Sequence, residues 1–448
     1  MMRSQNADAV KASSSNGIGS RMAVDWTQLP EELVQSISKK ITVYIDYVRF
    51  RAVCLMWRRS IPKVPRHLPP QLPWLMLPLS KSQPRYQRSF YDLSTGNTYH
   101  IELPEASRPE IRICSSSNGW LVILDDSPAI VLLNPLTHAK FHLPSLISFP
   151  NVVSFDYSRV GREYEFFNRD GELYYDSLRA MRDMFVRKIV ISSDPLNGNF
   201  VAMAILRYND ELAYYKNGDL SWTFFPDVGY IEDIVYYKEK FYALKEGGEI
   251  AVCNVNCELP SVSVNFRPPR PPIYCLVNRL VNSGDDELLM VARHCNNEVE
   301  MGHGFGTLRF DVFRMNWSGP SWDRVENLGD RLLFIGGNSS VSLSGSDFQG
   351  CLRNPCYLSP CDDYGQCLKN CIYFTDDIYC FNCNPDAFAY GVFGKKGDRG
   401  IFKLWDETFV SLPYRELERG SWELWFTPSP GGGRESEDDV GYEVDYGS

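Results

Sequence analysis

The chain has 448 residues, of which 44% are hydrophobic and 23% charged, a composition typical of a soluble globular protein with room for a sizeable core. Its net charge of −10 is unevenly spread: residues 1–66 hold 11 Lys and Arg against 5 Asp and Glu, so +6, which leaves −16 for the remainder. Because phosphate contacts need clustered cations, this acidic remainder is excluded from the class of general nucleic-acid binders.

The first 24 residues are polar and rich in serine, and they lack the apolar stretch of a secretory signal. We expect residues 1–24 to be a disordered leader. No apolar run in the chain is long enough to span a bilayer. We therefore expect a protein of the nucleus, the cytosol or both, with no membrane partner. Its 13 cysteines should then be mostly reduced thiols.

Apolar spacing predicts a first helix after Leu29 and Pro30. Proline is tolerated in a first helical turn, and the two glutamates that follow it suit a helix N-terminus. Leu33, Ile37 and Ile41 recur at every fourth position, which places them in one apolar stripe. A second helix is expected to start with Asp46 as its N-cap. Its apolar face has the spacing i, i+3, i+4, i+7 and consists of Phe50, Val53, Cys54 and Trp57.

Four interpretations of the second helix are open. Cys54 could be a reactive thiol, although it would lie mid-helix and away from the N-terminus that activates cysteines. The arginines at positions 49, 51, 58 and 59 could contact nucleic acid, or Trp57 could fill a core. The face could also dock a partner, because two short helices cannot bury both stripes alone. Five prolines in residues 62–73 favour an extended linker over packing on the downstream domain, so docking is the preferred interpretation.

From residue 74 to about residue 430 the pattern indicates an all-β domain. Residues 90–104 and 132–144 both read as strand, turn, strand and Leu-Pro, and the two copies lie about 40 residues apart. One repeat of about 40 residues per four-stranded unit is typical of a β-propeller. We predict a propeller of six or seven blades, with a pair of β-sandwiches as the alternative. Residues 431–448 are glycine-led and acidic, and we expect a disordered tail.

The helical region resembles the F-box, a module that binds the Skp adaptor of cullin-RING (SCF-type) ubiquitin ligases. The stretch that carries the resemblance is "LPEELVQSI" followed by "IDYVRFRAVCLMWRRSI", within residues 25–61. In that family the Leu-Pro start and the apolar helix face meet the adaptor. The resemblance therefore implies an adaptor-binding set made of Leu29, Pro30, Leu33, Ile37, Val53, Cys54 and Trp57.

The remainder resembles plant F-box proteins with a KIB-type β-propeller, a group also described loosely as F-box/kelch. The resemblance lies in "SSNGWLVI" (116–123), "LLNPLT" (132–137), "DIVYYKEKFYAL" (233–244) and "NCIYFTDD" (370–377). It implies a small all-α F-box joined to an all-β propeller. It also implies a non-catalytic receptor that holds a protein target for ubiquitination, with the Skp adaptor and, through it, a cullin as partners.

Seven cysteines lie between residues 351 and 383, and some have the spacing of zinc ligands. Zinc sites favour pairs separated by two to four residues. The candidate ligands are Cys367, Cys371, Cys380 and Cys383. Cys371 could instead be an inward-facing residue of the strand-like segment "NCIYFTDD", in which buried and exposed residues alternate. A disulfide is a third alternative. We favour reduced loop cysteines, and hence no metal and no cofactor.

Two other functional classes compete with the receptor. A propeller enzyme such as a glycoside hydrolase would need carboxylates that converge at one end of the channel, and no catalytic set is apparent in the sequence. A nucleic-acid-associated regulator would use the basic N-terminal helices. A receptor that works by proximity needs no reactive residue, because it raises the effective concentration of its target near a conjugating enzyme.

Overall fold

The computed structural model describes most of the chain between residues 25 and 429. The described ranges are 25–69, 71–79, 83–108, 110–168, 170–206, 211–225, 228–245, 247–255, 276–284, 287–295, 306–319, 321–348, 369–375, 398–412 and 423–429. The predicted leader (1–24) and the predicted acidic tail (431–448) lie outside the described residues. Within these ranges no helix is both long enough and apolar enough to cross a membrane.

A 3-10 helix and three short α-helices form the start of the described chain, which we call the helical unit (residues 25–61). A 3-10 helix (Trp26–Gln28) is followed by α1 (Glu31–Ser38), α2 (Tyr44–Arg51) and α3 (Leu55–Ser60). As expected, α1 begins directly after Pro30, and two glutamates occupy its first turn. Their carboxylates lie at the positive end of the helix dipole, which stabilises this start.

The second predicted helix is not continuous, and this expectation is wrong. Asp46 lies within the first turn of α2, whose N-cap is Val43. Cys54 has an extended backbone (φ −161°, ψ 168°) and ends the helical path between α2 and α3. Its Sγ accepts the backbone N–H of Trp57 at 3.5 Å, so Cys54 is the N-cap of α3. A cap satisfies an orphan N–H of the first turn, which is why the chain restarts a helix here.

The helical unit has a small apolar core of its own. Val34, Tyr47, Trp57 and Ile61 form a buried cluster, and the rings of Phe50 and Trp57 lie 4.4 Å apart. Each helix contributes to this cluster, so the inward side of every helix is used. The side chains that remain exposed are therefore those on the outward side.

The Pro-rich stretch 62–73 does not separate the helical unit from the rest of the protein, and this expectation is also wrong. Tyr44 and Ile45 of α2 are buried in one cluster with Trp74 and Phe90 of the first sheet. The side chain of Gln71 accepts the backbone N–H of Tyr44 at 3.3 Å. The physical reason is that α2 has a second apolar side, which the spacing analysis did not count and which the sheet covers.

The remaining described residues form seven sheets, of which six are arranged as blades. The first blade contains β27 (Leu424–Phe426), β1 (Trp74–Met76), β2 (Gln87–Asp92) and β3 (Thr98–Glu102); the second contains β4 (Arg112–Ser117), β5 (Trp120–Leu124), β6 (Ile130–Leu133) and β7 (Lys140–Leu143); the third contains β11 (Val186–Ile191), β12 (Val201–Leu206), β13 (Leu212–Lys216) and β14 (Thr223–Phe225).

The other three blades follow in chain order. The fourth contains β15 (Ile231–Tyr237), β16 (Lys240–Lys245) and β17 (Ile250–Cys253); the fifth contains β18 (Leu276–Asn282), β19 (Leu288–Cys295), β20 (Thr307–Asn316) and β21 (Ser321–Val325); the sixth contains β23 (Ser340–Ser344), β22 (Arg331–Ile335), β24 (Cys371–Phe374), β25 (Gly400–Lys403) and β26 (Thr408–Val410). Neighbouring strands within a blade are antiparallel, except that β22 and β24 run parallel.

The six blades form a closed ring, which confirms the predicted β-propeller. The contacting strands of successive blades are β27, β4, β11, β15, β18 and β23. Trp425 of β27 completes the ring, because its Nε1 donates to the carbonyl of Ile335 in the sixth blade at 3.1 Å. Since β27 pairs with β1, the first blade joins strands from both ends of the described propeller. Among the described residues the blade count is six.

A buried ion pair links three successive blades. Nζ of Lys188 (β11) lies 2.6 Å from Oδ1 of Asp233 (β15). The other carboxylate oxygen of Asp233 accepts the backbone N–H of Leu280 (β18) at 2.9 Å. Burial lowers the pKa of the Lys188 ammonium, and the adjacent Asp233 carboxylate opposes that effect. A buried charge needs such compensation, so this contact fixes the relative positions of the blades.

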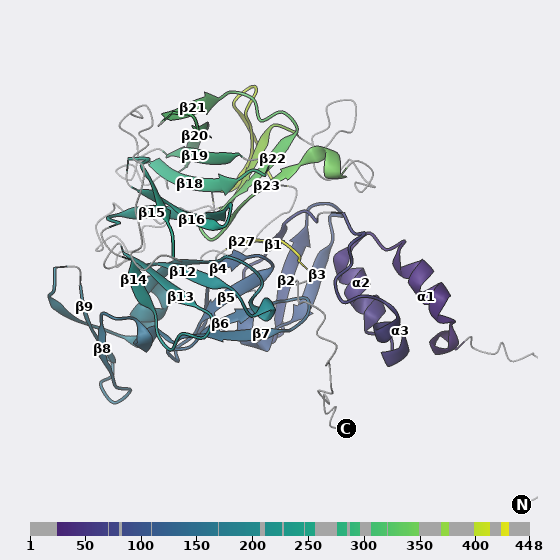
Figure 1. Cartoon of the computed structure of the whole chain (residues 1–448), viewed down its shortest axis with the longest axis horizontal. Coiled ribbons are helices and arrows are strands. Elements are labelled where there is room, and N and C mark those ends of the chain that lie inside the picture. Colours follow the sequence, from purple (N-terminus) through teal and green to yellow (C-terminus); the bar gives the residue numbers. More distant parts are fainter. Residues whose placement is uncertain are drawn as a thin grey trace, which may run out of the picture.

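The seventh sheet, which we call the projecting sheet, leaves the ring between β7 and β11. It consists of β8 (Val152–Phe155), β9 (Tyr164–Phe167) and β10 (Leu173–Asp176). A short helical turn, α4 (Leu178–Ala180), and a π-helix (Met181–Phe185) lead from it back to the third blade. Figure 1 shows β8 and β9 at one end of the long axis, and α1–α3 at the other. The two features are therefore well separated on the molecule.

Candidate adaptor-docking surface

The outward side of α1 exposes the apolar residues that the sequence analysis selected. Leu33 and Ile37 are one helical turn apart, and the side chain of Leu33 is 50% exposed. Val34 and Ser38, on the opposite side of the same helix, are buried. Burial of exposed leucine and isoleucine side chains is favourable, so this side of α1 is suited to binding another protein.

A second group of exposed apolar side chains lies between α2 and α3. Val53 and Leu55 flank the capping residue Cys54, which is itself half-buried. Trp26 of the 3-10 helix is also largely exposed. Helical spacing does not predict Trp26 and Leu55, because neither belongs to a regular helical stripe. The available signal was their type, since both are large apolar residues close to selected positions.

The remaining selected residues differ in how they are placed. Pro30 is exposed at the N-cap of α1, and Leu29 is half-buried against the core of the helical unit. Trp57 is 7% exposed and belongs to that core. A partner therefore has access to Pro30, but Trp57 acts mainly by holding the helices together. The structure thus divides the predicted set into an outward group and an inward group.

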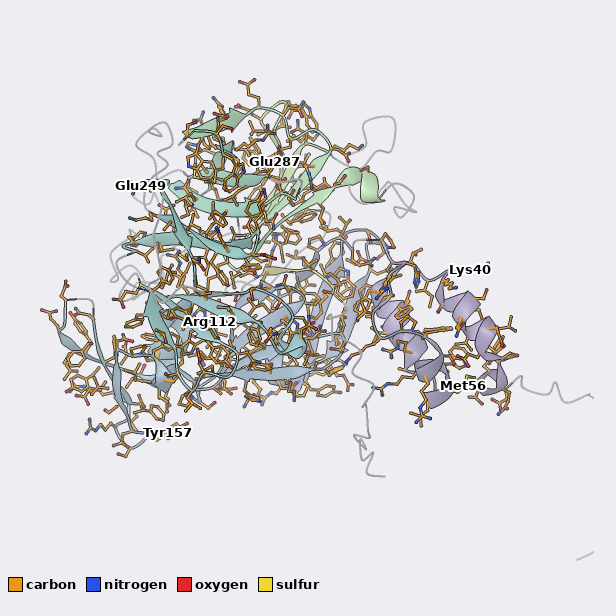
Figure 2. All side chains as sticks on the ribbon, viewed as in Figure 1. Lys40, Met56, Arg112, Tyr157, Glu249 and Glu287 are labelled. Atoms are coloured by element: carbon orange, nitrogen blue, oxygen red, sulfur yellow. The ribbon has the colours of Figure 1, made fainter. Side chains whose placement is uncertain are left out.

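Contacts with the first blade fix the orientation of the helical unit. The guanidinium of Arg49 lies 5.8 Å from the ring centroid of Tyr99 in β3, a cation–π distance. At the start of the connecting stretch, the hydroxyl of Tyr47 also donates to the carbonyl of Pro62 at 2.7 Å. Burial raises the pKa of Tyr44, so its phenol stays neutral against the blade. Figure 2 shows Lys40 and Met56 on this unit, at the opposite end of the molecule from Tyr157.

The arginines considered for nucleic acid are partly engaged within the protein. Arg51 donates to the carbonyl of Arg58 at 3.3 Å. Arg49 forms an ion pair with Asp46 at 3.4 Å, in addition to its contact with the first blade. Arg58 and Arg59 have exposed side chains. The basic stretch therefore offers a short exposed patch rather than a row of cations.

The zinc candidates are divided by the described ranges. Cys367, Cys380 and Cys383 lie outside the described residues. Cys371 is buried in β24, and its Sγ donates to the carbonyl of Lys369 at 3.2 Å. Within the described parts of the chain, no three His, Cys, Asp or Glu side chains are grouped as they would be around a metal ion.

The fold and this surface define the protein as a β-propeller, with six blades among the described residues and an N-terminal helical unit docked on the first blade. Residues 90–403 match the family described as KIB1-4 beta-propeller, and the chain belongs to that family. This confirms the family resemblance noted from the sequence.

Named relatives agree with this assignment. "F-box protein SKIP23" of Arabidopsis thaliana is 26% identical over 357 residues, which cover 72% of this chain and 81% of the relative. "F-box only protein 7" of the same plant is 23% identical over 336 residues, covering 70% and 79%. Among solved structures, that of U3-55K is 12% identical, covering 61% of this chain and 83% of its own, with a TM-score of 0.28.

Proposed function

We propose that this protein is the substrate-recognition subunit of an SCF-type ubiquitin ligase, in which residues 25–61 are an F-box and residues 74–430 a target-binding propeller. The F-box names of the relatives and the propeller family support an adaptor role. The observation that carries the proposal is the half-exposed Leu33 on a helical unit that already has its own core. The exposed side of α1 can therefore bind the Skp adaptor while the helical unit stays folded.

The mechanism follows from rigid attachment rather than from chemistry. Because α2 is buried on the first blade, an adaptor bound to α1 has a fixed position relative to the propeller. The complex with a cullin then holds a bound target near the conjugating enzyme, which raises the effective concentration of target lysines. On this proposal the protein is a non-catalytic subunit of the nucleus or the cytosol, and residues 62–73 are a short connection between its two parts.

Reconstitution of the complex tests this function. The full chain, co-expressed with a plant Skp adaptor, should co-purify with it in equal amounts and recruit a cullin. An absence of stable adaptor binding by the folded full chain would reject the proposal. Thermal unfolding of the propeller, measured without the adaptor, serves as the control that the chain is folded.

A further inference from the structure

The projecting sheet has two different faces. Tyr164 and Phe166 of β9 are almost fully buried and pack into the core shared by the second and third blades. Cross-strand register places Phe167 opposite Leu173, and Glu165 opposite Tyr175. Paired residues share a face, so Phe167, Leu173 and Tyr175 lie on the face turned away from that core.

This outer face carries accessible apolar side chains beside Glu165. Leu173 is 41% exposed and Tyr175 is 45% exposed, and Phe167 is similarly exposed. The hydroxyl of Tyr175 donates to Glu165 at 3.1 Å, which holds the ring on the face. Several large apolar side chains gathered on a short sheet at the end of a molecule are typical of an interaction surface.

The edge of the sheet is open as well. The strand order is β10-β9-β8, so β10 is an edge strand, and in the described parts of the chain no strand pairs with its outer side. Proteins protect such edges with lysine, proline, a bulge, other charged residues or a very short strand. The strand β10 has four residues, Leu-Tyr-Tyr-Asp, so its short length and Asp176 are its protection, and it contains neither lysine nor proline. Its outward backbone groups are therefore suited to accept an added strand.

The charge around this edge is negative. The turn before β10 and the strand itself, residues 169–176, contain three Asp and Glu against one Arg, so −2. Glu172 contacts the Asn168 amide and the Tyr174 hydroxyl, at 3.2 and 3.3 Å. In the described structure neither Glu172 nor Asp170 forms an ion pair with a lysine or arginine. Cationic side chains of a partner would be attracted to these carboxylates.

We propose that β10 binds an extended segment of a target protein as an additional antiparallel strand, and that the segment alternates apolar and basic residues. Apolar side chains of the added strand would extend the face of Leu173 and Tyr175, and its basic side chains would lie near the carboxylates at 170 and 172. Calling this partner a ubiquitination target rests on the proposed function, whereas the strand-binding site itself does not.

The position of the site allows adaptor and target to bind together. The projecting sheet and the helical unit lie at opposite ends of the long axis, as Figure 1 and the labelled Tyr157 and Met56 in Figure 2 show. A segment on β10 would therefore not compete with an adaptor on α1. It would also be presented at the end of the protein that the adaptor leaves free.

Fluorescence anisotropy with labelled nine-residue peptides tests the inference on the full chain. The probe alternates valine and lysine; one control alternates valine and glutamate, and another alternates glycine and lysine. The Val-Lys peptide should bind at least tenfold more tightly than either control. Equal binding of the Val-Lys and Gly-Lys peptides would overturn the inference, because charge alone would then explain it.

Variants locate the binding on the edge. Leu173→Lys and Tyr175→Lys each introduce a lysine into the edge strand β10, where a charged side chain opposes pairing with a further strand. Each should weaken binding of the Val-Lys peptide at least tenfold. Leu220→Lys, on a fully exposed residue after β13, is the matched control and should have no effect. Unchanged binding by both edge variants, with unchanged thermal unfolding, would contradict the site.

Adaptor binding separates this inference from the proposed function. Both edge variants should co-purify with the adaptor like the original protein. If the original protein binds the peptide but no adaptor, the function fails and the strand site stands. If it binds the adaptor but not the peptide, the strand site fails and the function stands.

Discussion

Leu33 and Val34 are neighbours in α1, yet the side chain of Leu33 is 50% exposed while that of Val34 is completely buried. This difference separates two roles that a hydrophobicity profile cannot distinguish. Val34 stabilises the helical unit from inside, whereas Leu33 offers an apolar contact to another molecule. Val34→Ala should therefore lower the stability of the unit by about 2 kcal/mol. Hydrogen exchange of α1–α3 measures this change, and unchanged exchange would contradict the burial.

Trp57 provides the second prediction, since it is a core residue rather than a contact residue. Trp57→Ala should cost about 3–5 kcal/mol and expose α1 and α3 to hydrogen exchange, with adaptor binding lost as a consequence. In the described structure its Nε1 has no hydrogen-bond partner, so Trp57→Phe sacrifices no bond there. Trp57→Phe should therefore retain the adaptor in co-purification. Loss of the adaptor with fully protected helices would instead assign Trp57 to the contact surface.

The ion pair between Lys188 and Asp233 predicts a non-additive result. Lys188→Met leaves a buried carboxylate without its cation and should cost about 3–5 kcal/mol in urea unfolding. The double variant Lys188→Met/Asp233→Asn should be more stable than Lys188→Met alone. The asparagine oxygen can still accept the N–H of Leu280, and the carboxylate that lost its Lys188 partner is gone. Additive losses in the double variant would show that the pair does not act as a unit.

Asp311 predicts how stability depends on acid. Its hydrogen bond to His294, at 2.7 Å, and the nearby Arg309 and Arg324 hold the pKa of this carboxyl below its ordinary value of 3.8. The folded protein therefore binds a proton less readily than the unfolded chain does. The stability that Asp311 contributes is complete well above pH 3.8, and it is lost as the pH falls through 3.8 and then through the lower pKa of the folded state.

The measurement for Asp311 compares melting temperatures of the original protein and Asp311→Asn between pH 6 and the lowest pH at which both fold. The advantage of the original protein should be constant above about pH 5 and shrink in more acidic buffer. An advantage that grows on acidification would contradict the lowered pKa.

Gly119 tests the junction between the second blade and the end of the described chain. It has φ +80°, and an added Cβ would lie 2.5 Å from the Cβ of Ser429. Gly161 has a similar φ of +83° with open space around it. Gly161→Ala therefore reports backbone strain alone, about 1 kcal/mol. Gly119→Ala should lower the melting temperature further, because it also meets Ser429; equal effects would show that the chain end does not pack there.

The fold was largely predictable because its signals are local. Strand and turn signals about 40 residues apart are enough to indicate a propeller, and Leu33 and Ile37 follow from helical spacing. The break before α3 was not predictable from spacing, because Cys54 caps a helix only when its backbone is extended. Whether α2 is covered by the first blade depends on Tyr44 and Trp74 meeting in space, and no sequence period reports such a contact.

The projecting sheet shows the same limit at the candidate partner site. Its residues read as ordinary strands in the sequence, since Tyr164 and Tyr175 are both aromatic residues in short β segments. Tyr164 is buried and Tyr175 is exposed because they lie on opposite faces of the sheet, and only one face packs against the blades. The open edge of β10 likewise becomes visible only once the strand order is known.

Adaptor co-purification by α1 variants tests the central claim most directly. Leu33→Lys/Ile37→Lys should reduce the adaptor recovered with the full chain at least tenfold, whereas Ser36→Lys, an exposed position on the same helix, should leave it unchanged. Surface substitutions of this kind change stability little, so all variants should unfold at the same temperature. Full adaptor recovery with the double variant would contradict the account, because the exposed side of α1 would then not be the docking surface.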